Sequence, residues 1–201
     1  MSYLDSRLRG NDDVPLIQSF LPRGLLVLCL AACPPALAAD VSVVASRDGD
    51  VLLIEASADF EGTLAQTWQV LTDYDNLASF IPNLTVSRVI ARARDSITLE
   101  QKGEARLLFL SYPIEVRLVV TEVPQTRVVS RAVAGNFREM SGTYAVEASG
   151  NRVKLRYSGR MVPAFFVPPL IGTWVLRNNV ETTFNALIDE IVRRQGAAPP
   201  Q

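Results

Sequence analysis

The sequence contains no histidine, and its two cysteines, Cys29 and Cys33, both lie in an apolar stretch near its beginning. The rest of the chain therefore has neither imidazole nor thiol. This excludes a Cys/His zinc site, a cysteine or serine nucleophile activated by histidine, and a disulfide framework. Any acid–base chemistry would have to use Asp, Glu, Tyr, Lys or Arg. We expect no metal site and no cofactor.

The chain also lacks an excess of charge of either sign, with a formal net charge of -1. Without an overall basic field, we expect no nucleic-acid partner. Apolar residues make up 48% of the chain and charged residues 20%, which is typical of a folded domain rather than a disordered one. A length of 201 residues is enough for one domain and short for two.

Residues 1–39 have the composition of a leader. An apolar core over Leu25–Ala32 follows a basic residue, two prolines come next, and Ala36-Leu37-Ala38 forms an A-x-A cleavage site. The core is far shorter than the roughly 20 residues of a membrane-spanning helix. We therefore expect a signal peptide behind a start site assigned too early, and a protein exported to the bacterial periplasm. The alternatives are a lipoprotein anchored through Cys33 and an uncleaved leader.

From residue 40 onward, runs typical of strands alternate with clusters of turn residues. Asp48-Gly49 separates the first two runs, which we expect to pair as a hairpin. The later runs follow each other closely, which predicts an antiparallel meander with one wet face and one interior face. The predicted strands cover approximately Val41–Ala45, Val51–Ala58, Thr85–Ala93, Ser96–Phe109, Pro113–Glu122, Thr126–Val133, Arg138–Ala148 and Arg152–Met161.

Three helices are predicted. Thr63 is a suitable N-cap for the first, in which apolar residues recur at helical spacing over Leu64–Leu71. A second short helix covers Asp73–Phe80. A long amphipathic helix runs over Pro169–Arg194, and residues 196–201 form a frayed tail.

Several motifs in these elements resemble START-like helix-grip proteins, the superfamily of polyketide cyclases/dehydrases and coenzyme Q-binding proteins. The motifs are Leu71–Pro82, Ser87-Arg88, Gln101-Lys102-Gly103, Gly135-Asn136-Phe137-Arg138, Gly142 and Tyr157. The resemblance covers roughly Val51–Val192, which is nearly all of residues 40–195, and we treat residues 40–195 as one domain. It implies an α+β fold: a curved antiparallel sheet of about seven strands wrapped around a long C-terminal helix, with two short helices after the first strand. It also implies a small apolar or lipidic ligand, and it brings no catalytic motif.

We expect the ligand cavity between the inward strand faces and the long helix. Gln101 and Gly103 interrupt an apolar face, where they either contact a ligand head group or mark a bulge. Tyr144 and Tyr157 face inward, where each hydroxyl binds either a ligand oxygen or a backbone partner. The candidate ligand-binding residues are Trp68, Phe80, Leu99, Gln101, Gly103, Val116, Leu118, Met140, Tyr144, Tyr157, Phe165, Phe166 and Trp174.

Two further segments allow two interpretations each. Asp73, Tyr74 and Asp75 are either an acid–base site or the start of a helix, where aspartate caps and complements the dipole; we favour capping. The segment Val162–Ile171 is rich in proline and apolar residues. It is either a lid that contacts a membrane during ligand transfer or a loop packed on the long helix as extra core.

Three functional hypotheses follow. The first is a non-enzymatic protein that binds or transfers a hydrophobic small molecule or lipid, such as a quinone, isoprenoid or fatty acid, in the cell envelope. The second is a cyclase or dehydratase that uses cavity carboxylates or tyrosines. The third is an envelope scaffold whose cavity is filled by its own side chains, with Phe137, Met140 and Trp174 closing the space. The volume and lining of the cavity discriminate among them.

Overall fold

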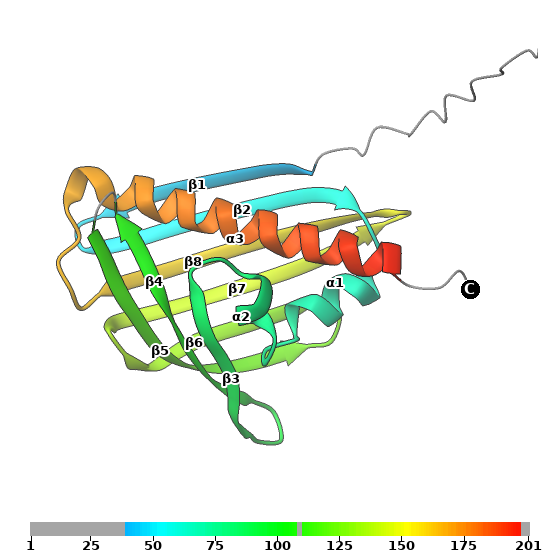
Figure 1. The fold of residues 1–201 in the computed structure, drawn as a ribbon, viewed down its shortest axis with the longest axis horizontal. Helices are drawn as coiled ribbons and strands as arrows, with labels where there is room; N and C mark the ends of the chain where they lie inside the picture. Colours follow the sequence, from blue (N-terminus) through cyan, green and yellow to red (C-terminus); the bar gives the residue numbers. More distant parts are fainter. Residues whose placement is uncertain (1–38, 108–109, 198–201) are drawn as a thin grey trace, which may run out of the picture. The chain divides into compact units, whose positions relative to one another are not determined.

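The computed structural model describes residues 39–107 and 110–197. The described chain forms one sheet of eight antiparallel strands in the order β1-β2-β8-β7-β6-β5-β4-β3, with three helices (Figure 1). The strands are β1 (Asp40–Asp48), β2 (Val51–Glu61), β3 (Leu84–Arg92), β4 (Ile97–Leu107), β5 (Leu110–Val123), β6 (Arg127–Gly135), β7 (Phe137–Ser149) and β8 (Arg152–Pro163). The helices are α1 (Leu64–Leu71), α2 (Leu77–Phe80) and α3 (Pro169–Ala197).

The predicted hairpin at Asp48-Gly49 is confirmed, since β1 pairs with β2 from Asp48 opposite Val51. Gly49 has a φ of +57°, a left-handed conformation that glycine adopts without strain. Because β1 belongs to the sheet, the sheet has eight strands rather than about seven, and the two short helices follow the second strand rather than the first. Residues 108–109, the end of one predicted strand, lie outside the described residues.

The start of α1 agrees with the sequence, whereas α2 is shorter than predicted. The Thr63 hydroxyl accepts a hydrogen bond from the Gln66 backbone N–H, so Thr63 is the N-cap. The second helix was expected over Asp73–Phe80, but its first four residues form a turn closed by the Asn76 N–H on the Asp73 carbonyl. The turn brings the chain next to β3, where the Asp75 carboxylate accepts a hydrogen bond from the Val89 backbone N–H.

The long helix α3 crosses the sheet with its C-terminal part beside α1 (Figure 1). Its C-terminal half buries Phe184, Leu187, Ile188 and Ile191 in a core cluster shared with β1, β2, β7, β8 and α1. A second cluster lies on β4, β5 and β6 under Tyr74. Burial of the C-terminal half anchors the helix, because each fully buried large apolar side chain contributes about 1.5–3 kcal/mol.

The segment before α3 contains less loop than predicted. Val162 and Pro163 belong to β8, where they pair with the start of β7, and Pro169 already begins α3. The proline is accommodated because the pairing is irregular at this end of β7, where a missing N–H donor costs little. The connecting loop is therefore residues 164–168 only, which we call the β8–α3 loop.

Candidate functional site

An apolar cavity of about 300 Å³ lies between the sheet and the N-terminal half of α3. Its walls come from β2, β4, β5, β7, β8, the start of β3 with the three residues before it, the β8–α3 loop and α3. This volume is at the small end of the range for ligand sites, which is about 300–1,000 Å³. The lining residues are Leu52, Ile81, Pro82, Asn83, Leu84, Gln101, Lys102, Gly103, Glu104, Ala105, Tyr112, Ile114, Val116, Phe137, Met140, Met161, Pro163, Phe165, Phe166, Val167, Pro168, Gly172, Val175, Leu176, Asn179 and Thr183.

Strand alternation places the sheet residues of the cavity. Ile114 and Val116 are two residues apart on β5, so their side chains lie on the same face. Met140 on β7 pairs directly with Met161 on β8, which brings the two flexible thioether side chains together in the cavity wall. The meander therefore brings residues that are distant in sequence into one apolar surface.

The helix contributes a single stripe to the cavity. Gly172, Val175, Leu176, Asn179 and Thr183 line it, at spacings of three and four residues that form one face of a helix. The same face continues into the buried core at the C-terminal half of α3. One face of α3 is thus packed solidly at one end and lines a hollow at the other.

The β8–α3 loop closes the cavity beside this stripe. The Phe165 ring stacks on Tyr112 with 5.4 Å between centroids and meets Phe137 edge-on at 6.0 Å. Phe166, the next residue, is 74% exposed. One phenylalanine therefore forms wall and its neighbour faces outward, although Phe166 also borders the cavity mouth.

The polar groups of the cavity are mostly engaged with the protein itself. The Gln101 amide donates to the Ser87 hydroxyl at 3.2 Å. Gly103 lies against the chain turn at Asn83: a Cβ there would be 2.3 Å from the Asn83 carbonyl oxygen. The pairing of β3 with β4 is irregular at the same place. Close backbone packing therefore accounts for this glycine. The extra residue of the irregular pairing lies on β3 and not in the strand that carries Gly103, where a bulge was considered, while Gln101 both borders the cavity and packs on β3.

Tyr144 and Tyr157 form a pair on the inward sheet face, with ring centroids 4.6 Å apart, and both contact Phe184 of α3. The Tyr157 hydroxyl lies over Gly142 and Gly159, where a Cβ on either would come within 2.7 Å of it. Within the described chain, neither tyrosine hydroxyl has a hydrogen-bond partner, so the backbone partner considered from the sequence is absent. Burial raises the pKa of Tyr157 to about 12 and raises that of Tyr144 further.

The structure distributes the predicted site residues over three places. Those in the cavity lining are Gln101, Gly103, Val116, Met140, Phe165 and Phe166. Those in the hydrophobic clusters beside it are Trp68, Phe80, Leu99, Leu118, Tyr144 and Tyr157. Trp174 is 52% exposed, so its predicted inward position is wrong. It is two residues from Leu176, which at about 100° per residue places it on the opposite side of α3.

Sequence reasoning missed most of the helix stripe and the cavity ends of β5 and β8. The signal was present: Val175, Leu176, Asn179 and Thr183 have helical spacing, and Ile114 alternates with Val116. Asn179 and Thr183 are polar, which concealed the stripe. The Asn179 amide and the Thr183 hydroxyl each donate to a carbonyl four residues earlier in α3, and the Asn179 side-chain oxygen accepts from the Asn83 amide at 3.5 Å.

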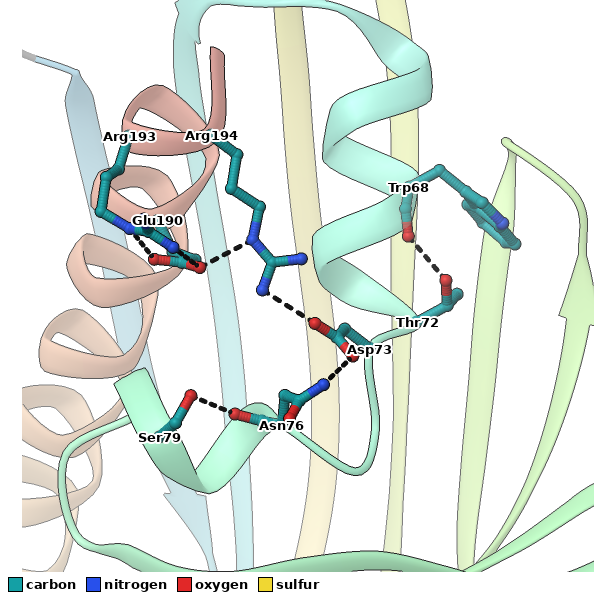
Figure 2. Close-up of polar contacts among 8 residues, drawn as sticks. All are labelled: Trp68, Thr72, Asp73, Asn76, Ser79, Glu190, Arg193 and Arg194. Atoms are coloured by element: carbon teal, nitrogen blue, oxygen red, sulfur yellow. Dashed lines mark hydrogen bonds and ion pairs between the residues drawn. The ribbon is translucent and has the colours of Figure 1, made fainter. Parts of the chain in front are cut away.

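The segment Leu71–Pro82 lies outside the cavity except at its end, and its two aspartates make contacts within the protein. Figure 2 shows those of Asp73. Asp73 accepts hydrogen bonds from Arg194 of α3 at 2.8 Å and from the Asn76 side chain at 2.7 Å. Asp75 accepts from the Val89 N–H at 2.7 Å. The prediction that these carboxylates cap a helix is wrong, because the N-cap of α2 is Asn76 and has no side-chain cap. Their observed contacts are nevertheless structural.

The described residues contain no group of three or more acidic, cysteine or histidine side chains placed to hold a metal ion. Within the same part of the chain, no helix is both long enough and apolar enough to cross a membrane.

Solved structures with this fold include lipid-transfer proteins and an aromatase/cyclase. Human StAR-related lipid transfer protein 5 is 11% identical, with a TM-score of 0.64 over 77% of this chain and 83% of that one. A STAR-related lipid transfer protein fragment from Xanthomonas axonopodis is 10% identical, with a TM-score of 0.61 over 76% and 93%. The Zhui aromatase/cyclase from Streptomyces sp. R1128 is 15% identical, with a TM-score of 0.61 over 72% and 95%. At these identities the likeness shows the fold alone.

No curated protein sequence matches the chain. The family model described as polyketide cyclase/dehydrase and lipid transport matches residues 61–188, from the end of β2 into the buried half of α3. This match covers well over half of the chain, and the helix-grip fold predicted from the sequence motifs is confirmed. The chain therefore belongs to the polyketide cyclase/dehydrase and lipid transport family.

Proposed function

We propose that this protein binds a hydrophobic small molecule or lipid in the cavity under α3 and carries it without changing it chemically. The observation that supports this most is that the two halves of α3 have different surroundings. Its C-terminal half packs into a solid core, whereas the same face of its N-terminal half lines a hollow of about 300 Å³. Two structurally similar proteins are named as lipid transfer proteins, which agrees with this use of the fold.

The binding energy would come from burial. Covering about 250 Å² of apolar ligand surface at about 25 cal/mol per Å² gives about 6 kcal/mol, before the cost of association is subtracted. The lining favours such a ligand, because most of its side chains are aliphatic or aromatic. The scaffold hypothesis loses support, since Phe137 and Met140 border open space instead of filling it and Trp174 lies outside.

A cyclase or dehydratase would need acid and base groups that converge on a ligand. The name of the Zhui aromatase/cyclase keeps this alternative open. Among the described lining residues, Glu104 is the one carboxylate, and it accepts a hydrogen bond from the Ser111 hydroxyl at 2.9 Å. The tyrosine pair lies beside the cavity with raised pKa values, so it supplies protonated hydroxyls and no base at neutral pH. This arrangement supports binding over chemistry.

Native mass spectrometry of the protein purified without detergent tests the proposal. We expect a bound hydrophobic molecule that is released intact on denaturation. Leu176→Trp should fill the cavity and abolish the adduct, because Leu176 lines it. Val192→Trp is the matched control on the same helix, since Val192 is 50% exposed. Repeated recovery of empty wild-type protein would contradict binding, and recovery of a modified molecule would favour the enzyme.

The proposal includes contact with a membrane through the β8–α3 loop during transfer. Phe166 and Trp174 are 74% and 52% exposed, and Phe166 borders the cavity mouth. Exposed aromatic side chains bind at membrane interfaces. Phe166→Ser should weaken flotation with lipid vesicles, whereas Val133→Ser, at a valine that is 56% exposed on β6, should not. Equal flotation of the two variants would contradict this part of the proposal.

The site of action proposed here is the bacterial periplasm, on the basis of the leader sequence, which lies outside the described residues. The mass of the mature protein tests this. Cleavage near Ala38 predicts a soluble periplasmic product without lipid, whereas lipidation would leave a product that begins at Cys33. An uncleaved chain in the cytoplasm would contradict export.

A further inference from the structure

Two hollows border the β8–α3 loop. The first is the apolar cavity. The second, of about 370 Å³, borders the same loop and is lined by Arg47, Asp50 and Arg138 together with apolar residues. Both hollows border Leu52, Pro163, Phe165, Phe166 and Val167. The apolar hollow and the charged one therefore adjoin each other, with these five residues bordering both.

Two guanidinium groups face the second hollow. Arg47 donates to the Val167 carbonyl at 2.9 Å and to the Gly49 carbonyl at 2.7 Å. Arg138 donates to the Pro163 carbonyl at 3.4 Å and to Asp50 at 2.7 Å. Each guanidinium has more N–H groups than these contacts use, and the planar fork suits a carboxylate or phosphate.

The charge in the second hollow is unbalanced. The hydrogen bond and charge of Arg138 hold the pKa of Asp50 below its usual range, so Asp50 is an anion at neutral pH. One carboxylate among two arginines leaves an excess of positive charge along this lining. The other charged residues at the apolar cavity are Lys102 and Glu104, one of each sign, and Lys102 is already paired with Glu115 at 3.2 Å. The side of the loop with Arg47 and Arg138 is therefore the more favourable place for an anion.

We infer that the ligand is a single-chain amphiphile with an anionic head group: its chain lies in the apolar cavity, and its carboxylate or phosphate binds Arg47 and Arg138 in the adjoining hollow. This inference rests on the proposed function, since it assigns the polar end of the same ligand. The observation that supports the inference is that the two hollows adjoin and share lining residues. A free anion would need only the second hollow, whereas an amphiphile uses both.

The test compares two ligands that differ only in the head group. A neutral fluorescent probe, N-phenyl-1-naphthylamine, is bound to the full-length protein and displaced by dodecanoate or by dodecan-1-ol. We expect dodecanoate to bind about tenfold more tightly, the effect of one hydrogen bond to a charged group. The preference should shrink as salt rises from about 0.01 M to about 1 M, because the Debye length falls from about 30 Å to about 3 Å.

Variants with opposite effects on the preference for dodecanoate identify the groups that bind the anionic head group. Arg47→Met and Arg138→Met should abolish the preference for dodecanoate while leaving the affinity for dodecan-1-ol unchanged. Asp50→Asn should increase the preference, because it removes the carboxylate that competes for Arg138, and loss of folding cannot produce this gain. Arg156→Met is the matched control: Arg156 is 48% exposed and paired with Glu147, and it lines neither hollow.

The outcomes separate this inference from the proposed function. Equal affinity for the acid and the alcohol would overturn the inference and leave hydrophobic binding intact. A preference that survives in both arginine variants would also overturn it, because the charge would then be read elsewhere. Failure of the probe and of both ligands to bind would contradict the proposed function itself. A preference for dodecanoate that is lost in Arg47→Met and Arg138→Met and raised in Asp50→Asn would support the inference.

Discussion

Arg194 connects the C-terminal end of α3 to the turn between α1 and α2 (Figure 2). Its guanidinium donates to Asp73 at 2.8 Å and to Glu190 at 2.7 Å, and it lies 5.7 Å from the centre of the Phe80 ring. The side chains of Arg194 and Asp73 are each 23% exposed, so solvent screens the pair only in part. Arg194→Met removes the charge and keeps a flexible apolar stem over Phe80.

The expected loss of stability follows from these contacts. The hydrogen-bonded ion pair with Asp73 contributes about 1 kcal/mol after a discount for partial exposure. The cation–π contact with Phe80 adds about 0.5 kcal/mol. Glu190 loses little, about 0.5 kcal/mol, because Arg193 still donates two hydrogen bonds to it at 2.7 and 2.6 Å. Together these terms predict a decrease of about 2 kcal/mol in the free energy of unfolding.

Urea unfolding of a double-mutant cycle measures the contribution of the pair. Arg194→Met, Asp73→Asn and the double variant should give a coupling of about 1 kcal/mol. Arg193→Met is the control, because the Arg193 side chain is 66% exposed, so its loss should destabilise the protein clearly less than Arg194→Met does. Zero coupling, or equal losses for Arg193→Met and Arg194→Met, would refute the assignment of the helix–turn connection to this ion pair.

Three further predictions concern stability. Hydrogen bonds from the neighbouring arginines, Arg193 first, lower the pKa of Glu190 from 4.5 to about 2, so its stabilisation is complete above pH 4.5 and is lost as pH falls toward 2. The stability difference between wild type and Glu190→Gln, measured by urea unfolding, should shrink over that window; a constant difference would contradict this. Gly103→Ala should cost more than about 2 kcal/mol, because the new Cβ would meet a backbone carbonyl at 2.3 Å, whereas Gly196→Ala, which meets nothing within 4 Å, should be neutral. Phe184→Ala, at a fully buried residue, should lower the unfolding free energy by about 3–5 kcal/mol in the same assay; a loss below about 1 kcal/mol would contradict its place in the core.

The fold was largely predictable because its signals are local. Alternation of polar and apolar residues identified the strands, and helical spacing identified α1 and α3. The β1–β2 turn needs a left-handed residue, which Gly49 supplies. Where the prediction of an element was wrong, a distant partner decided the structure: Pro163 is in a strand because β7 pairs with it, not because of its own preference.

The candidate site was less predictable than the fold, because partners that are distant in sequence decide where its residues lie. Asp73 and Asp75 have partners 121 and 14 residues away, so their roles depend on tertiary contacts that spacing does not encode. Trp174 has an apolar side chain, but burial of Phe184 and its neighbours in the core decides which face of α3 points inward. That orientation places Trp174 on the outer face. The polar residues of the helix stripe, Asn179 and Thr183, were missed because an apolar stripe was expected.

If the hollow between the sheet and the N-terminal half of α3 holds the ligand, a photoreactive fatty acid should label its walls. A diazirine-bearing chain, illuminated with the full-length protein and mapped by peptide mass spectrometry, is expected to label Met140, Met161 and Leu176, which line the cavity. Labelling should disappear in Leu176→Trp and persist in Val192→Trp. Labels confined to exposed surfaces such as Val192 or Val133, or equal labelling of the two tryptophan variants, would contradict binding in this cavity.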